Sequence, residues 1–434
     1  MSADSRMGNR WYVVGLLAVL YVFSYADRLI LALLVEPLKA DLAISDTQIA
    51  LLIGPAFAFL YAILGLPVAW LADRFPRVVI AVAGVTIWSL STIASAYAGS
   101  FEQLFALRMG LALGEAVLSP VAVSLISDYF KRRERSTPTA VFVSCGSIGL
   151  VTAYIIGGAL IALIQNGGLS AVPIIGHLAV WRATLILVGL PGLVLAVLMA
   201  LTVREPTRGR LDELPASAVA QVGIFDSVRQ AARFYVLFFL GNSICMTLTF
   251  AAVTWFPTYL IRAYGMSSSQ SGYLFGVSLM VGALFNFLIP TAAQWLARRG
   301  RKEALLLLSL ALIPVGSVLF GAALIQTNLA PTIILLILGF GILSGTNALS
   351  SVAVALTAPA AFRGRLMAIN LACSNLIGLS LGPFAVARIA EAYFSGPRAL
   401  GSGMLVVGCV ATPVAWLLIF AALPPYRAAM RRSA

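Results

Sequence analysis

The sequence predicts an all-α membrane protein of twelve transmembrane helices arranged as two six-helix bundles. Three observations lead to this prediction. Of the 434 residues, 61% are apolar and only 10% are charged, which lies well outside the composition of soluble domains. Twelve segments reach the length of about 20 apolar residues that crosses a hydrocarbon core of ~30 Å. The basic residues, finally, fall almost entirely on one side of the resulting twelve-span model.

The twelve predicted spans are separated by short polar breaks. They cover residues 11–36, 47–72, 78–100, 102–130, 137–164, 180–203, 232–262, 269–297, 303–326, 331–359, 363–394 and 398–424.

The distribution of Lys and Arg predicts the topology of these spans. Of the 29 basic residues, 22 lie in the two termini and in the loops of one side, four lie on the opposite side, and three lie within spans. Positive residues mark the cytoplasmic side of membrane proteins. Both termini are therefore expected in the cytoplasm, and the net charge of +13 is explained without nucleic-acid binding.

A charged break between the sixth and seventh spans divides the chain. We expect an N-terminal bundle over 1–203, a cytoplasmic linker over 204–231 and a C-terminal bundle with a short cytoplasmic tail over 232–434. The segment AWLADRFPR after the second span has a partly conserved counterpart, AQWLARRGR, after the eighth. This similarity indicates that the two six-span halves arose by duplication. Paired halves of this kind are typical of secondary transporters, with the substrate site near the bilayer midplane.

Two motifs resemble the signatures of the major facilitator superfamily. The LADRFPR stretch resembles the cytoplasmic signature after the second span, and RMGLALGEA (108–116) resembles the signature of the fourth. Ala69 and Pro76 stand where the first signature has glycines.

The motifs YADR (25–28), RMGLALGEA and SDYFKRRERS (127–136) together look more narrowly like the spinster family of lipid transporters. That resemblance implies a major facilitator fold and transport of sphingolipids or lysophospholipids.

Four charged residues lie deep in the first and fourth spans, namely Asp27, Arg28, Arg108 and Glu115. With ~1.5 Å of rise per residue, Arg108 lies about 9 Å and Glu115 about 20 Å from the outer boundary, and Asp27 and Arg28 lie about 12–14 Å deep, between them. Two charges of each sign therefore share one slab and are expected to face a central cavity.

Charged residues at such depth indicate an ion or substrate path. We expect Asp27 and Glu115 to couple transport to protons, and Arg28 and Arg108 to form the substrate and charge network. In one access state Arg28 is expected to pair with Glu115 and leave Asp27 in a water-filled vestibule. The alternative is a static ion-pair cluster, although burying such a pair adds little stability.

The C-terminal half carries neutral polar residues in its spans, which predicts a substrate cavity without charge. Each of them could instead serve as an interhelical contact. The candidate cavity residues are Asn242, Thr247, Trp255, Asn347 and Asn370.

Acids and arginines at cytoplasmic helix ends predict a gate, in which breakable salt bridges hold the inner mouth shut. Plain positive-inside topology is the competing explanation for the arginines. The candidate gate residues are Asp73, Arg74, Arg77, Asp128 and Arg135.

The sequence thus favours a proton-coupled secondary transporter of an amphiphilic anionic lipid, such as a sphingoid phosphate or a lysophospholipid. The alternative is a multidrug or small organic-anion exporter. An enzyme is not expected, because the chain has one histidine and no catalytic constellation. We expect a monomer in a bacterial inner membrane, with a small amphiphilic substrate, protons and membrane lipids as partners, without a cofactor, and driven by the proton gradient.

Overall fold

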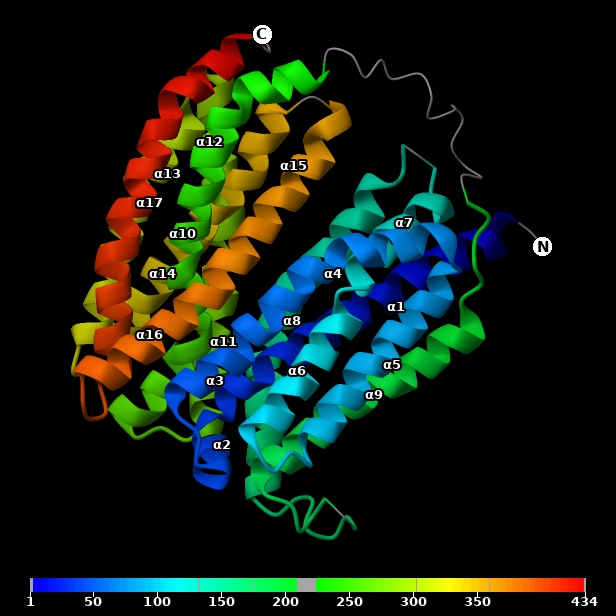
Figure 1. The fold of residues 1–434 in the computed structure, drawn as a ribbon, viewed down its shortest axis with the longest axis vertical. Helices are drawn as coiled ribbons and strands as arrows, with labels where there is room; N and C mark the ends of the chain where they lie inside the picture. The colour runs from blue at the N-terminus through cyan, green and yellow to red at the C-terminus, as the bar shows by residue number, and fades with distance from the viewer. Residues whose placement is uncertain are drawn as a thin grey trace. The chain divides into compact units, whose positions relative to one another are not determined.

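The computed structural model describes residues 3–131, 133–173, 175–208, 224–301, 303–358 and 360–432, and Figure 1 shows their arrangement. Over these ranges the chain is helical, without a strand. Eleven of the described helices are long and apolar enough to cross a membrane, or up to twelve if a bent pair counts as one span. The prediction of an all-α protein with about twelve membrane helices is confirmed.

The chain forms two compact units. The first comprises the described residues within Met1–Pro215 and within Ser267–Gly276, and the second comprises those within Ala216–Met266 and within Val277–Ala434. Most of the expected linker, 209–223, lies outside the described residues.

The first unit is built from α1 and its continuation η1, followed by α2 to α9. Within it α1 packs along α8, and α5 packs against both α6 and α9. The bounds are α1 Ala3–Leu29, η1 Ile30–Leu33, α2 Val35–Leu42, α3 Asp46–Ile53, α4 Pro55–Arg74, α5 Arg77–Ser95, α6 Phe101–Glu115, α7 Leu118–Tyr129, α8 Ser136–Gln165 and α9 Val180–Thr202.

The second unit contains α10 and α12 to α17, and α11 is shared between the units. Here α10 packs along α17, and α14 packs against α12 and α13. The bounds are α10 Ile224–Tyr264, α11 Ser268–Gly282, α12 Phe285–Arg298, α13 Ala304–Ile325, α14 Leu329–Thr357, α15 Ala360–Cys373, the π-helical turn η3 Ser374–Leu379, α16 Ser380–Tyr393 and α17 Ala399–Arg432.

Several predicted spans are interrupted, and in three of them a proline lies at the break. Pro55 begins α4 after the break at Gly54. Pro120 lies in the first turn of α7, and Pro383 follows the π-helical turn. Proline cannot donate to the carbonyl four residues earlier and its ring clashes with that carbonyl, so the helix before it ends or changes its hydrogen bonding.

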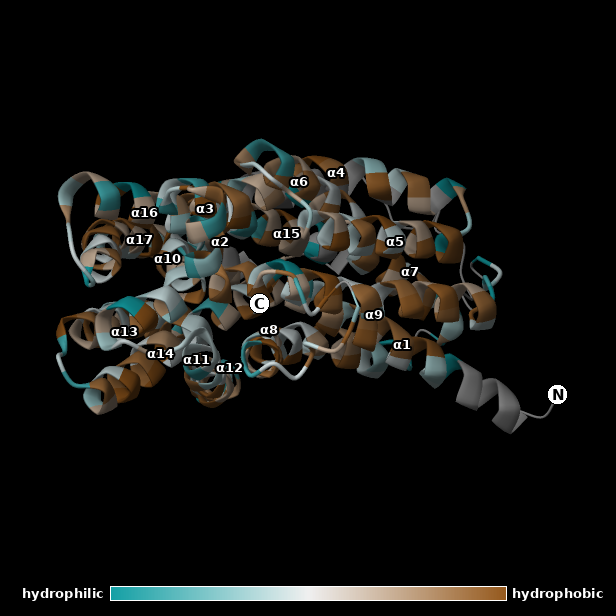
Figure 2. Ribbon diagram, turned by 90° about the horizontal axis from the view of Figure 1, so that it is seen from below, coloured by the Kyte–Doolittle hydropathy of each residue, from teal (hydrophilic) through white to brown (hydrophobic). Residues whose placement is uncertain are grey.

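The outer surfaces of the helices are apolar. Figure 2 shows hydrophobic residues along the helices and hydrophilic residues gathered at loops and helix ends. Large apolar side chains are widely exposed, including Leu201, Phe287 and Val318. Extended exposed apolar surface marks contact with a membrane or a partner, and the length of the helices points to the membrane.

Two glycines bring α5 and α6 into backbone contact. A Cβ atom added at Gly114 would lie 2.5 Å from the carbonyl oxygen of Gly84 and 2.6 Å from the amide nitrogen of Trp88. Small residues allow membrane helices to approach this closely. This contact positions α6, which carries Arg108 and Glu115.

We expect Gly114→Ala to destabilise the protein by about 1–3 kcal/mol, the usual result of overpacking a tight core, because backbone atoms would have to separate. The measurement is the thermal unfolding midpoint of the purified protein. Gly15→Ala is the matched control, since nothing lies within 4 Å of its added Cβ. Equal midpoints for the two variants would contradict a close α5–α6 contact.

Candidate functional site

The centre of the first unit holds an ion pair between α1 and α6. Arg28 donates to Oε2 of Glu115 from Nη2 at 2.5 Å and from Nε at 3.1 Å. The Glu115 side chain has no exposed surface, whereas 15% of the Arg28 side chain is exposed. Arg28 is therefore the member of the pair that a ligand can reach.

Three aromatic rings surround the guanidinium of Arg28. Its Cζ lies 3.9 Å from the ring centre of Phe57, 5.0 Å from that of Tyr25 and 5.7 Å from that of Tyr61. Each distance is within the range of cation–π attraction. These three aromatic neighbours of Arg28 were not predicted from the sequence. The three-residue spacing of Tyr25 and Arg28, which places both on one face of a helix, could have indicated the first of them.

The second acid and the second arginine of the cluster are close but incompletely bonded. Arg108 donates from Nη1 to the backbone oxygen of Asp27 at 3.1 Å, while its Nε and Nη2 have no hydrogen-bond partner. Both carboxylate oxygens of Asp27 also lack a partner, although the residue has no exposed surface. The expectation of a water-filled vestibule around Asp27 is therefore wrong for this structure, because the helices of the unit enclose the side chain.

The structure thus brings all four predicted charges together within one unit. Unsatisfied atoms remain on Asp27, Arg108 and Glu115, whose Oε1 also lacks a partner. Buried polar groups are normally hydrogen-bonded, and an exception calls for an explanation such as a functional role. A cluster with spare donors and acceptors can accept a proton and an anion without dismantling the fold.

The second unit contains the predicted neutral polar residues. Asn242 on α10 contacts the π-helical turn η3, and Asn370 lies on α15, four residues before that turn begins. Asn242 donates to the hydroxyl of Ser374 at 3.2 Å, and Asn370 donates to that of Ser350 at 3.1 Å. π-helical turns inside membrane-length helices are frequent at functional sites. This arrangement links α10, η3, α14 and α15 through amide and hydroxyl groups.

The other predicted cavity residues differ in their surroundings. Trp255 is fully buried and donates to the carbonyl of Pro383 at 2.8 Å, so it braces α10 against α16. Thr247 donates to the carbonyl of Ile244 within its own helix at 2.6 Å. Asn347 is half-buried on α14.

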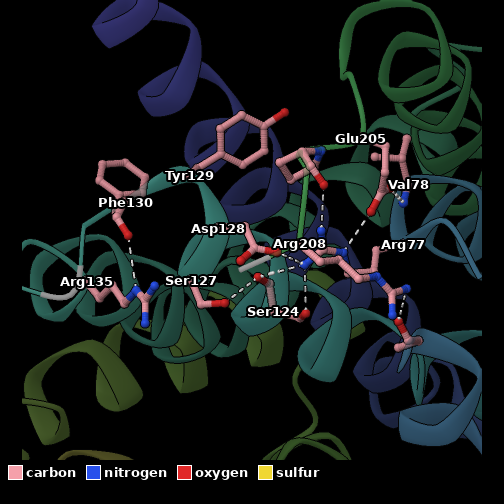
Figure 3. A network of polar contacts seen from close by, with 12 residues as sticks. Arg77, Val78, Ser124, Ser127, Asp128, Tyr129, Phe130, Arg135, Glu205 and Arg208 are labelled. Carbon is pink, nitrogen blue, oxygen red and sulfur yellow. Dashed lines mark hydrogen bonds and ion pairs between the residues drawn. The ribbon is translucent and has the colours of Figure 1, made fainter. Parts of the chain in front are cut away.

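At the other end of the first unit, Arg77 is the centre of a polar network (Figure 3). Its Nη1 donates to Asp128, and its Nε donates to Glu205 at 2.8 Å. The hydroxyl of Ser124 and the carbonyl of Pro206 accept further bonds at 3.1 and 3.0 Å. Arg77 thus joins the start of α5 to α7 and to the segment after α9.

The remaining predicted gate residues have separate contacts. The guanidinium of Arg74 lies 4.2 Å from the ring of Trp70, and Arg135 donates to the carbonyl of Phe130 at 3.1 Å. The side chain of Asp73 lies outside the described residues. Every contact described for these residues lies within the first unit.

Glu205 was missed by sequence reasoning. Besides accepting from Arg77, its Oε2 accepts from the backbone amide of Val78 at 2.8 Å, at the beginning of α5. Nearby Arg208 donates to the carbonyls of Ala72 and Phe75, both at 2.7 Å. Glu205 and Pro206 follow closely on the last predicted span of the unit, and an acid at that place among basic residues could have indicated an ion pair.

No group of three or more His, Cys, Asp or Glu side chains that could hold a metal ion occurs in the described part of the chain.

Comparison with known proteins identifies the family of this chain. The family model described as Major Facilitator Superfamily matches residues 17–383. An MFS-type efflux pump of Mycolicibacterium smegmatis is 28% identical over 92% of this chain and 89% of its own length. A probable galactarate/D-glucarate transporter of Bacillus subtilis is 26% identical over 69% of this chain and 68% of its own.

Spinster proteins also match. Protein spinster homolog 1 of Xenopus tropicalis is 27% identical over 58% of this chain and 46% of its own length. The crystal structure of a bacterial spinster homolog, inward-facing and unoccupied, superposes with a TM-score of 0.82 at 23% identity, covering 98% of this chain and 97% of that one. The chain, with its membrane helices in two units and a buried charge cluster, belongs to the Major Facilitator Superfamily and is a transporter.

Proposed function

We propose that this transporter moves an amphiphilic anion, such as a sphingoid phosphate or a lysophospholipid, by alternating access coupled to protons. The observation that carries the proposal is the position of Arg28, which is partly exposed, bonded to Glu115 and ringed by aromatic side chains. A guanidinium binds phosphate or carboxylate through paired hydrogen bonds.

Charge balance within the cluster supports the coupling. The four side chains carry two positive and two negative charges, so their sum is zero when all are ionised. Binding an anion at Arg28 would leave an uncompensated negative charge in a buried site, which is expensive in a membrane. Uptake of a proton by Asp27 or Glu115 restores neutrality, and arginine does not release its proton.

The two acids are suited to different parts of this exchange. Glu115 holds Arg28 and would give up that partner when a substrate anion arrives. Asp27 has no hydrogen-bond partner for its carboxylate, and an isolated buried carboxylate is more readily accommodated when neutral. We therefore assign the first proton to Asp27.

The aromatic ring around Arg28 favours an amphiphile over a small hydrophilic anion. Tyr25, Phe57 and Tyr61 offer apolar area next to the cationic centre, and such surface suits a substrate with a hydrocarbon portion. A small organic anion is the second candidate, and the similarity to a probable galactarate/D-glucarate transporter supports it. A multidrug exporter is a further alternative, which the similarity to an efflux pump supports.

A thermal-shift screen of the purified protein separates these candidates. We expect lysophospholipids or sphingoid phosphates to raise the unfolding midpoint more than galactarate or cationic drugs do, because at equal concentration a ligand that binds the folded state more tightly stabilises it more. A larger shift with galactarate would favour the small organic anion.

The distribution of basic residues supports an orientation with both termini in the cytoplasm, and we propose a bacterial inner membrane as the location. In that orientation the network around Arg77 lies at the inner mouth. We propose that Asp73, Arg74, Arg77, Asp128 and Arg135 form the gate there, and that the protein acts as a monomer.

We expect Asp27→Asn to abolish the response of transport to an imposed pH gradient, because the amide cannot exchange a proton, while substrate binding persists. Transport into liposomes with and without the gradient, alongside direct binding, is the measurement. Asp41→Asn is the control, since Asp41 pairs with Arg182 outside the cluster at 2.9 Å. If Asp27→Asn responds to the gradient as the parent does, Glu115 becomes the coupling acid.

Arg28→Ala should weaken substrate binding by about tenfold or more, since hydrogen bonds to a charged group contribute ~1.5–3 kcal/mol and 1.4 kcal/mol corresponds to tenfold. Equilibrium binding to the purified variant tests this, with Arg388→Ala as the control in another span. The double variant Arg28→Ala, Glu115→Gln removes one charge of each sign, so the cluster stays neutral in sum, and it separates loss of binding from loss of folding. Parental affinity in the double variant would exclude contact between Arg28 and the substrate.

Asp128→Asn should shift the protein toward inward-facing states, because it removes a charged acceptor of Arg77. Spin-label distances across the cytoplasmic mouth report the shift, and Asp73→Asn can be measured in the same way. Glu134→Gln, which breaks only the exposed pair with Arg10, is the control. An unchanged distance distribution in both aspartate variants would reduce the network to a structural role.

A further inference from the structure

A cavity of 580 Å³ lies within the second unit, between α12, α13 and α14. Its volume is in the range of ligand pockets, ~300–1,000 Å³. Most of the lining side chains are apolar. The polar ones are Gln294, Arg298 and Ser351. The apolar lining includes Ala293, Ala297, Leu305, Val352, Ala355 and Leu356.

The packing of α12 on α14 explains why the cavity is there. At the start of α12 the two helices are in close contact, because a Cβ added at Gly345 would lie 2.6 Å from the carbonyl oxygen of Phe285. Toward the end of α12 the facing residues include Ala297 and Ala355, whose single methyl groups leave space between the helices. The cavity is therefore at the basic end of α12, which terminates at Arg298.

Arg298 provides a cation at this cavity. Its side chain is exposed, and no ion pair or hydrogen bond is recorded for it among the residues that the structure describes. Its neighbour Arg299 is positioned differently, with its guanidinium 3.7 Å from the ring of Trp295. Two adjacent arginines thus differ in that only Arg298 lines the cavity.

We propose that this cavity binds an anionic phospholipid of the surrounding bilayer. Part of an acyl chain lies against the alanine and leucine walls, and the phosphate is held by Arg298, with Gln294 and Ser351 as further hydrogen-bond donors. Basic pockets between membrane helices are suited to anionic head groups, and a charge-assisted bond to phosphate is about twice as strong as a neutral one. Apolar walls next to a cation select a lipid over a free anion.

The site is distinct from the proposed transport site. None of its lining residues belongs to the first unit, and none is acidic, so the lipid is a bound component and no proton is exchanged. The proposal does not depend on the identity of the transported substrate.

The test compares Arg298→Gln with Arg299→Gln, which remove the same charge from adjacent positions. Purified protein in a neutral detergent is titrated with phosphatidylglycerol, phosphatidylcholine or inorganic phosphate, and the unfolding midpoint is measured. We expect phosphatidylglycerol to raise the midpoint of the parent and of Arg299→Gln, and Arg298→Gln to lose about half of that rise or more. Phosphatidylcholine and inorganic phosphate should have little effect.

Two further variants complete the test. Ala355→Trp fills the cavity and should also lose the phosphatidylglycerol effect, while Arg28→Ala should keep it, which separates this site from the transport site. Equal effects of phosphatidylglycerol on the unfolding midpoints of the Arg298 and Arg299 variants would overturn the proposal, because the lipid would then bind through the general positive charge of the surface and not through the cavity. A rise with inorganic phosphate as large as that with lipid would also overturn it.

Discussion

The ion pair between Arg28 and Glu115 is the interaction on which the first unit depends. Removing one partner of a buried pair typically costs 3–5 kcal/mol, because the other charge is left without compensation. The pair therefore holds α1 and α6 in register. The close contact of Gly84 with Gly114 keeps α6 against α5, so the backbone packing and the charge pairing support one another.

The pair is nevertheless poorly suited to a purely structural role. Apolar side chains of similar volume would hold two helices together at least as well. Here one partner is partly exposed, and the nearby groups of Asp27 and Arg108 retain unsatisfied atoms. A cluster that is neutral in sum but incompletely bonded can rearrange, which is what a transporter requires of its central charges.

The two units differ in the chemistry at their centres. The first concentrates ionisable groups, whereas the second offers asparagines and hydroxyls around the π-helical turn. Neutral hydrogen bonds between membrane helices are individually modest. The arginine network near the start of α5, including Glu205, ties α5 and α7 to the start of the segment that leaves α9.

The sequence by itself determined the membrane class, the number and approximate bounds of the spans, and the four charged residues of the cluster. These follow from composition, apolar length and charge, which are local properties that a bilayer requires of any chain crossing it. The family motifs were equally visible. The helix breaks before Pro55, Pro120 and Pro383 were not predicted, because other prolines, such as Pro67, Pro191 and Pro314, lie inside unbroken helices.

Only the tertiary structure decided which of these residues meet. It brought Phe57 and Tyr61 from α4 to Arg28 on α1, and it paired Arg77 with Glu205 across more than a hundred residues. It also enclosed Asp27, which had been expected in a water-filled vestibule. The physical reason is that helical rise fixes depth along the membrane normal, whereas the direction in which a side chain points, and its partner, depend on how the helices rotate and pack.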